Sequence, residues 1–227
     1  MITPPSAFLL DERVFLTLGI LRVAACLERD GYSVEMLDLS GVANYVAAVL
    51  AHVEHSVAGV FGITATTPQM PATAKIVAAL REQTCSRIIL GGPHATLVHA
   101  AARRERKLGI AGRGQKSLEQ LIQMFDVLVV GDGEDAIFEA LRPNPTKIVD
   151  GDDPHANLFM TNKRLGEMPL PARHLVDVSS YHYTIEGAPA LSMIAQLGCP
   201  FRLQFLRGAR VGHAPANPHA EYGQRRR

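Results

Sequence analysis

The sequence predicts an α/β protein built on a doubly wound, mainly parallel sheet. Between residues 17 and 149, short and almost continuously apolar runs alternate with longer runs that have helical spacing. Apolar strands of this kind are buried on both faces, so helices must cover both sides of the sheet. The chain has 227 residues, of which 47% are hydrophobic and 20% charged, which is enough to bury such a core and excludes an intrinsically disordered chain.

The first half of the pattern starts with a helix. It begins near Thr17 and keeps helical spacing to Leu27, and Gly31 provides a stop. The elements expected after it are a strand at residues 34–39, a helix at residues 42–54, a strand at residues 57–63 and a helix at residues 70–81.

The second half continues this alternation. The elements expected there are a strand at residues 87–90, a helix at residues 97–107, a short helix at residues 118–125 capped by Ser117, a strand at residues 126–130, a helix at residues 136–141 and a terminal strand at residues 147–149. We expect Asp132 and Glu134 to begin the helix that follows them, because negative charge is favourable at a helix N-terminus.

Few residues are available for the strand that this fold needs before its first helix. An open sheet needs a strand before its first helix, yet only three residues precede Pro4 and Pro5, whereas strands typically have about five or six. Two interpretations stay open: the first strand is stubby, or the natural beginning lies upstream. A short central strand leaves neighbouring backbone groups unpaired, so a structural remnant of marginal stability is one hypothesis.

We divide the chain into a sheet domain at residues 1–150, a linker at residues 151–189 and a distinct C-terminal part at residues 190–227. The linker starts with a turn-rich break and has poor periodicity. Residues 200–227 contain six arginines against one acid, and the rest of the chain has a net charge of −4. The arginines lack interleaved aromatic residues, so we expect no nucleic-acid partner.

The sequence lacks the features of a membrane-spanning or secreted protein. No run approaches 18 apolar residues, and the N-terminus lacks the pattern of a secretory signal, so we expect neither a membrane span nor secretion. Cys26, Cys85 and Cys199 lie far apart in the sequence, which is no disulfide framework. We therefore expect a cytoplasmic protein.

Ligands of open parallel sheets bind outside the carboxyl ends of the strands. Several loops at those ends carry glycines, which allow close backbone approach, or hydroxyl residues, which can bond a polar ligand. This composition suits a large cofactor that crosses several loops.

No dinucleotide fingerprint, phosphate-binding loop or nucleophile elbow occurs in the sequence, and neither a catalytic residue nor a metal site is assigned.

Short sequence pieces in these loops carry a family resemblance. They are Thr3-Pro4-Pro5, the run Leu-Gly-Ile-Leu-Arg-Val-Ala-Ala at residues 18–25, Asp38-Leu39, Gly62-Ile63-Thr64, Gly-Gly-Pro-His-Ala-Thr at residues 91–96, Val-Gly-Asp-Gly-Glu at residues 130–134 and Met-Pro-Leu-Pro-Ala-Arg at residues 168–173. In this order and spacing they resemble the N-terminal cobalamin-binding domain of cobalamin-dependent radical S-adenosylmethionine enzymes.

The resemblance implies a Rossmann-like or flavodoxin-like domain that holds a corrinoid against the carboxyl edge of the sheet, with its nucleotide tail threaded into the sheet region. It also implies that the lower axial ligand need not be histidine, and the Asp38-Leu39-Ser40 run has serine where other cobalamin domains have histidine. The candidate cofactor-binding residues are Thr3, Pro4, Pro5, Asp38, Leu39, Ser40, Thr64, Ala65, Thr66, Gln69, Gly91, Gly92, His94, Gly131, Gly133 and Glu134.

The resemblance continues into residues 190–201, which look like the first strand of a radical-enzyme barrel. In the family, three cysteines then hold an iron–sulfur cluster that binds S-adenosylmethionine. Here Cys199 fits the first position, but Leu203 and Leu206 stand at the other two. The chain also ends too soon for a barrel, so neither the cluster nor S-adenosylmethionine is supported.

These observations favour a cobalamin-binding module that is truncated from a radical enzyme and has no catalytic activity of its own. One alternative is a cobalamin-binding subunit that works with a separate iron–sulfur radical enzyme. Another is a flavodoxin-like domain that binds a different small ligand at the same edge.

Overall fold

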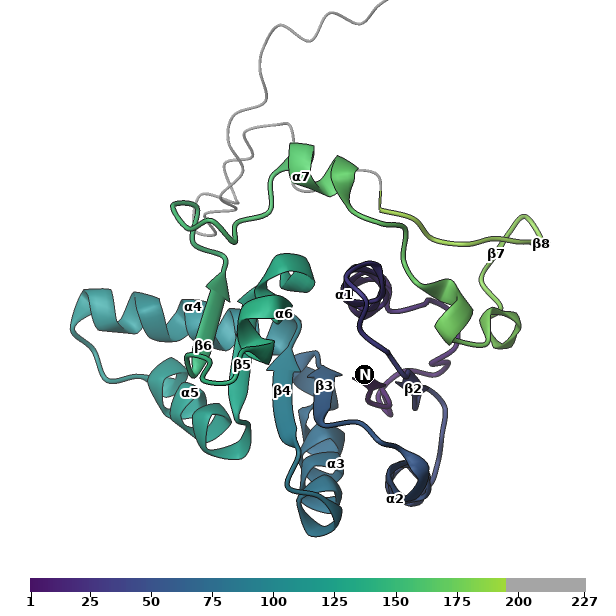
Figure 1. Ribbon diagram of the computed structural model, residues 1–227, viewed down its shortest axis with the longest axis horizontal. Helices are drawn as coiled ribbons and strands as arrows, with labels where there is room; N and C mark the ends of the chain where they lie inside the picture. Colours follow the sequence, from purple (N-terminus) through teal and green to yellow (C-terminus); the bar gives the residue numbers. More distant parts are fainter. Residues whose placement is uncertain (195–227) are drawn as a thin grey trace, which may run out of the picture.

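The computed structural model describes residues 1–194 and arranges them around a six-stranded parallel sheet (Figure 1). The spatial order is β2-β1-β3-β4-β5-β6. The strands are β1 (Ile2–Thr3), β2 (Leu37–Asp38), β3 (Val60–Thr64), β4 (Arg87–Gly91), β5 (Val127–Gly131) and β6 (Ile148–Gly151). The chain thus starts in the interior of the sheet, moves to one edge and returns to build the other, which confirms the doubly wound fold.

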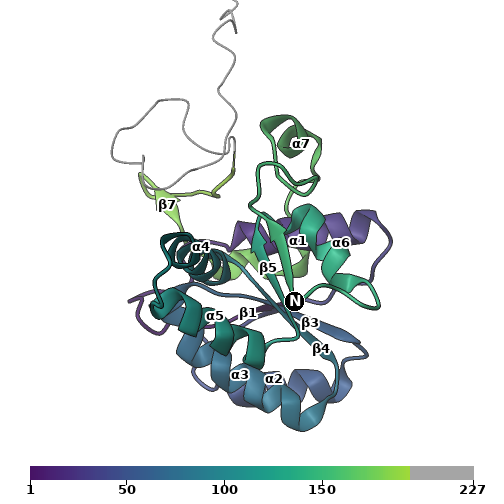
Figure 2. The same cartoon turned by 90° about the vertical axis from the view of Figure 1, so that its left-hand side faces the viewer.

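Two layers of helices cover the sheet (Figure 2). One face packs against α1 (Leu18–Arg29) and α6 (Gly133–Leu141), which contact each other. The other face packs against α2 (Tyr45–His55), α3 (Met70–Gln83), α4 (Pro93–Leu108) and α5 (Arg113–Met124). Successive residues of β5 alternate between two buried clusters, because neighbouring side chains of a strand point to opposite faces. None of the helices in residues 1–194 is both long and apolar enough to cross a membrane.

The first strand is as short as the sequence indicates, yet it lies inside the sheet. Ile2 pairs with Leu37 of β2 and with Ile63 of β3. The first three residues of β3 therefore have a strand partner only on the β4 side. A hollow of about 380 Å³ lies beside them, with Val60 and Phe61 in its lining.

Several element boundaries differ from the sequence predictions, those of β2, α4 and α5 most clearly. β2 covers only two of the six residues expected as a strand. Helix α4 begins at Pro93, four residues early, because proline at the first helical position already has a helical φ. Helix α5 begins at Arg113, where the Glu105 carboxylate accepts hydrogen bonds from the N–H groups of Gly114 and Gln115. Ser117 is therefore not its cap.

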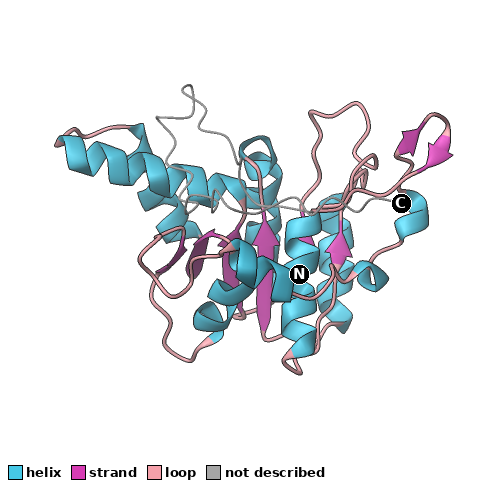
Figure 3. Ribbon diagram, turned by 90° about the horizontal axis from the view of Figure 1, so that it is seen from above, coloured by secondary structure: helices cyan, strands magenta, loops and turns pink. Residues whose placement is uncertain are grey.

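The segment predicted as a linker packs against the sheet domain. It contains a short helix, α7 (Asn162–Glu167), and the N–H of Ala172 donates to the Leu21 carbonyl of α1 over 2.9 Å. Met160 and Ala172 are buried. The segment ends in a two-stranded hairpin, β7 (Thr184–Ile185) and β8 (Ala188–Pro189), which stands apart from the central sheet (Figure 3). Cys199 and the predicted barrel remnant beyond residue 194 lie outside the described residues.

Candidate cofactor-binding edge

The loops singled out in the sequence all meet at one edge of the sheet. Because the strands are parallel, their carboxyl ends at Thr3, Asp38, Thr64, Gly91 and Gly131 lie on the same side. The structure therefore satisfies the geometric requirement for a ligand that crosses several loops. That each candidate residue contacts a cofactor stays a prediction.

A cavity of about 300 Å³ opens at this edge between α1, α6 and strands β3 to β5. Apolar side chains form part of its wall, among them Val23, Val129 and Ile137. Six of the predicted residues line it: Thr64, Gly91, Gly92, Gly131, Gly133 and Glu134.

The glycines of this cavity have different roles. Gly92 has φ +91°, and a Cβ there would lie 2.5 Å from the Thr64 hydroxyl oxygen, so its turn requires glycine. Gly131, at φ +80°, is likewise confined by the backbone after β6. Gly91 and Gly19 differ, because a Cβ would meet nothing closer than 3.9 Å at Gly91 and nothing within 4 Å at Gly19. Those two positions leave open space in the cavity wall.

At the end of β2, the candidate polar groups already bond to the protein. The Asp38 carboxylate accepts hydrogen bonds from the Tyr181 hydroxyl over 2.6 Å and from the Ser40 hydroxyl over 2.8 Å, and Arg13 lies 3.3 Å away. Burial, with a contribution from Asp38, raises the pKa of Tyr181 to about 12, so the phenol stays protonated. The neighbouring Leu39 is part of the core.

Gln69 ties two loops of the edge together. Its side-chain oxygen accepts a hydrogen bond from the Thr66 N–H over 2.9 Å, and its amide group donates to the Pro4 carbonyl and the Ser6 hydroxyl over 2.8 Å each. Gln69 is buried, as are Thr3, Pro4, Pro5 and Ala65. Because they are buried, these residues support the loops of this edge.

His94 lies in the first turn of α4, beside the loop that follows β3. Its Nδ1 is 2.9 Å from the Thr67 hydroxyl oxygen, and burial lowers its pKa, so the ring is neutral at pH 7. Residues 1–194 contain no cluster of three or more histidine, cysteine or acidic side chains that could hold a metal ion.

Sequence reasoning missed Arg22 and Gly19 of α1. Arg22 lines the cavity and is only 5% exposed, and its Nε lies 3.4 Å from Oε1 of the buried Glu134. Burial raises the pKa of Glu134, and Arg22 acts in the opposite direction. One signal was present: Arg22 is the single charged residue in the apolar stretch at residues 18–27.

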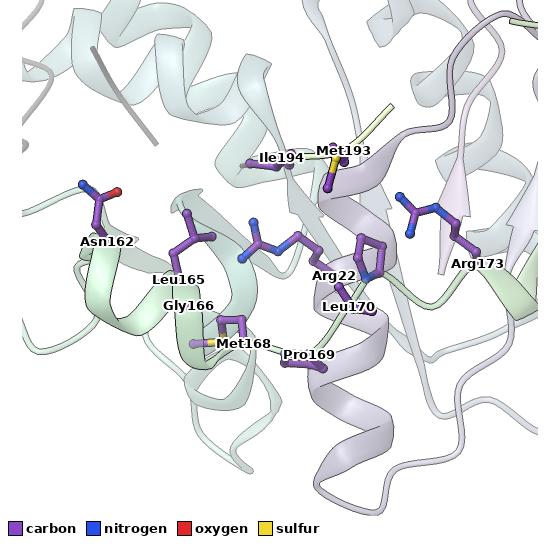
Figure 4. A pocket seen from close by; sticks show the side chains of 11 residues that line it. Arg22, Asn162, Leu165, Gly166, Met168, Pro169, Leu170, Arg173, Met193 and Ile194 are labelled. Atoms are coloured by element: carbon purple, nitrogen blue, oxygen red, sulfur yellow. The ribbon is translucent and has the colours of Figure 1, made fainter. Parts of the chain in front are cut away.

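Arg22 also lines a second cavity of about 610 Å³ between α1 and the segment that contains α7 (Figure 4). Met168, Pro169 and Leu170 form part of its wall, and Arg173 lies across from Arg22. Ile194 borders both cavities. Arg22 therefore stands where the two cavities meet.

Comparison with known protein families finds a match to the B12 binding domain over residues 12–122. This range runs from the loop before α1 into α5 and includes the loops that follow β2, β3 and β4. Comparisons with curated proteins and with solved structures gave no significant match. The parallel sheet with its loops at one edge and the match over residues 12–122 together support a cobalamin-binding domain in this part of the chain.

Proposed function

We propose that the chain binds a corrinoid against the carboxyl edge of its sheet, with the nucleotide tail in the cavity between α1 and α6. The observation that carries the proposal is this cavity. It lies at the edge where ligands of open parallel sheets bind, and its wall is open at Gly19 and Gly91. The B12-binding match covers both of these glycines.

The residues around the cavity suit the tail of a corrinoid. Apolar side chains such as Val23, Val129 and Ile137 can pack against an aromatic base, and the Thr64 hydroxyl can bond a polar edge. Bound corrinoid would supply a cobalt centre. The part of this chain is to bind and orient it.

The lower face of the corrinoid meets no histidine from the loop after β2. Ser40 stands at that position, and its hydroxyl already donates to Asp38. This arrangement agrees with binding in which the chain provides no imidazole from this loop.

We propose further that this chain does not perform radical chemistry itself but presents its corrinoid to a separate iron–sulfur radical enzyme. Leu203 and Leu206 offer no thiolate for a cluster. The loop that follows β1 at the same edge exposes several large apolar side chains, which a partner protein would cover. They are Phe8, Leu9, Leu10 and Phe15.

The test is binding of hydroxocobalamin, followed by the visible spectrum that the protein retains after desalting. We expect the wild type to retain corrinoid and Gly19→Phe to lose it, because the new ring would occupy the open space at the cavity wall. Ala51→Phe, at an exposed position of α2 on the other face, is the matched control and should bind normally. A protein that retains added flavin mononucleotide but no corrinoid would contradict the proposal.

A further inference from the structure

We infer that Arg22 recognises the phosphodiester of the corrinoid's nucleotide tail, so that the chain selects complete corrinoids over those without a tail. This inference rests on the proposed function and adds a chemical basis for selectivity. It starts from a buried cation in an otherwise apolar part of α1.

The Arg22 side chain is largely buried, but its Nη atoms reach open space, because the one buried side-chain nitrogen without a hydrogen bond among the described residues is Nε of Arg173. The Nε of Arg22 lies 3.4 Å from Glu134, and no hydrogen bond within residues 1–194 engages its two Nη atoms. Figure 4 shows the end of the side chain directed into the larger cavity. The planar fork of donors of an arginine matches the geometry of a phosphate. A phosphate at the junction of the two cavities would therefore satisfy Arg22.

Helix N-termini provide a second source of positive potential at this place. Helices α1, α4 and α6 all begin beside the smaller cavity. Among the described residues, the N-cap residue of α1, Thr17, makes no side-chain cap hydrogen bond. Helix α4 offers less, because Pro93 has no N–H and the His94 N–H already donates to the Ala65 carbonyl over 3.0 Å. N-terminal N–H groups and the helix dipole favour an anion. The mouth of the cavity thus combines the partial positive charge of the α1 N-terminus with the charge of Arg22, and the carboxylates of Asp132 and Glu134, which also line it, act against an anion.

A second arginine strengthens the site from the other side. Arg173 lines the larger cavity, and its Nη2 donates to the Ser192 carbonyl over 2.9 Å. Its Nε is buried and has no hydrogen-bond partner among the described residues. Two arginines with unused donors therefore border one cavity.

Glu134 is a positioning residue in this account. It holds the Arg22 side chain against α6 while no anion is present. Loss of Arg22 alone would leave the Glu134 carboxylate buried without its cation, which destabilises a protein. The experiment therefore includes the double variant Arg22→Met/Glu134→Gln, which removes both charges.

The test compares hydroxocobalamin with cobinamide, which has the corrin ring but neither phosphodiester nor base. For Arg22→Met we expect the Kd for hydroxocobalamin to rise about 10- to 100-fold, the range of one charged hydrogen-bonding interaction. The Kd for cobinamide should stay within twofold. The double variant should behave the same way, and Arg22→Lys should recover part of the loss. Arg29→Met, at the exposed far end of the same helix, is the control and should change neither.

Two results would overturn the inference and leave the proposed function standing. In the first, Arg22→Met and the double variant raise the Kd for cobinamide as much as the Kd for hydroxocobalamin. In the second, they change neither Kd. A wild-type protein that binds neither corrinoid would overturn the proposed function itself, and the inference with it.

Discussion

Cys26 and Cys85 differ in environment, and this difference reports on how α1 is covered. Cys26 is buried, with its Sγ 3.6 Å from the Met168 sulfur, and burial raises its pKa to about 11. Cys85 is exposed. Since the thiolate is the reactive form, iodoacetamide at pH 8 should modify Cys26 more than about 100-fold more slowly than Cys85. Peptide mass spectrometry after timed quenching measures both rates. Equal rates would contradict the packing of the Met168 segment on α1.

Some site residues can be predicted from the sequence, and others depend on contacts between distant parts of the chain. Gly92 and Gly131 could be found from the sequence, because their turns need glycine and follow recognisable strands. Arg22 and Gly19 lie inside a helix, where periodicity does not reveal which side faces a cavity. The sequence predicts Asp38 as a candidate, but no local pattern reveals its hydrogen bond to Tyr181, 143 residues away.

At the scale of elements, Gln69 joins the loop after β1 to the loop after β3. Replacing it by alanine leaves the Pro4 carbonyl and the Thr66 N–H without their partner in a buried site. We expect Gln69→Ala to lower the free energy of unfolding by about 2 kcal/mol, as measured by urea denaturation. Gln83→Ala, at the exposed end of α3, is the control and should change it by less than about 0.5 kcal/mol. If Gln69→Ala also changed the free energy of unfolding by less than about 0.5 kcal/mol, the hydrogen bonds of Gln69 would not stabilise the contact between the two loops.

Asp126 makes the stability of the β4 and β5 region depend on pH. Burial would raise its pKa, but the Ile88 N–H and the Arg81 guanidinium, each 2.7 Å from Oδ2, outweigh burial and hold the pKa below its usual value. A carboxylate with a lowered pKa stabilises the fold above its unfolded-state pKa, near 4, and this contribution is lost as the pH falls through the folded value.

We therefore expect Asp126→Asn to cost about 1 kcal/mol at pH 7, a modest amount because solvent screens the half-exposed pair. At pH 2.5 the difference from the wild type should shrink. Urea denaturation at the two pH values measures it. A cost that grows on acidification would contradict the assigned direction of the pKa.

The strands and helices of the central sheet follow from periodicity, whereas several of their ends do not. The apolar runs of β3, β4 and β5 predict strands, and their alternation with helices along the chain indicates a parallel sheet. The start of α5 depends on Glu105, which reaches from the preceding helix to its first N–H groups. Such a tertiary cap has no signal in the local sequence. The short β2 reflects pairing with only two residues of β1.

At the scale of the whole molecule, the segment beyond β6 is part of the folded unit. Ala172 is 3% exposed and packs against Ala24 and Ala25 of α1. We expect Ala172→Asp to lower the free energy of unfolding by about 2 kcal/mol, because a carboxylate would be buried there without a partner. The variant should also speed alkylation of Cys26, since the segment that covers it would detach. Leu170→Asp, at an exposed position of the same segment, serves as control. Unchanged stability of Ala172→Asp would mean that the segment is only loosely placed.

The sequence pattern of this segment is irregular and therefore predicts a linker. Its contacts with α1 come from single small or sulfur-containing side chains rather than from a periodic apolar face. Pattern-based reasoning detects periodic faces and therefore misses packing of this kind.

The central claim is that a corrinoid occupies the carboxyl edge of the sheet, and hydrogen exchange with and without hydroxocobalamin tests it most directly. The account predicts slower amide exchange on binding in the loops at residues 64–67, 91–94 and 131–134, and unchanged exchange at the opposite edge around residues 56–59 and 84–86. Protection at the opposite edge, or no protection in any of the three loops despite bound corrinoid, would contradict the account.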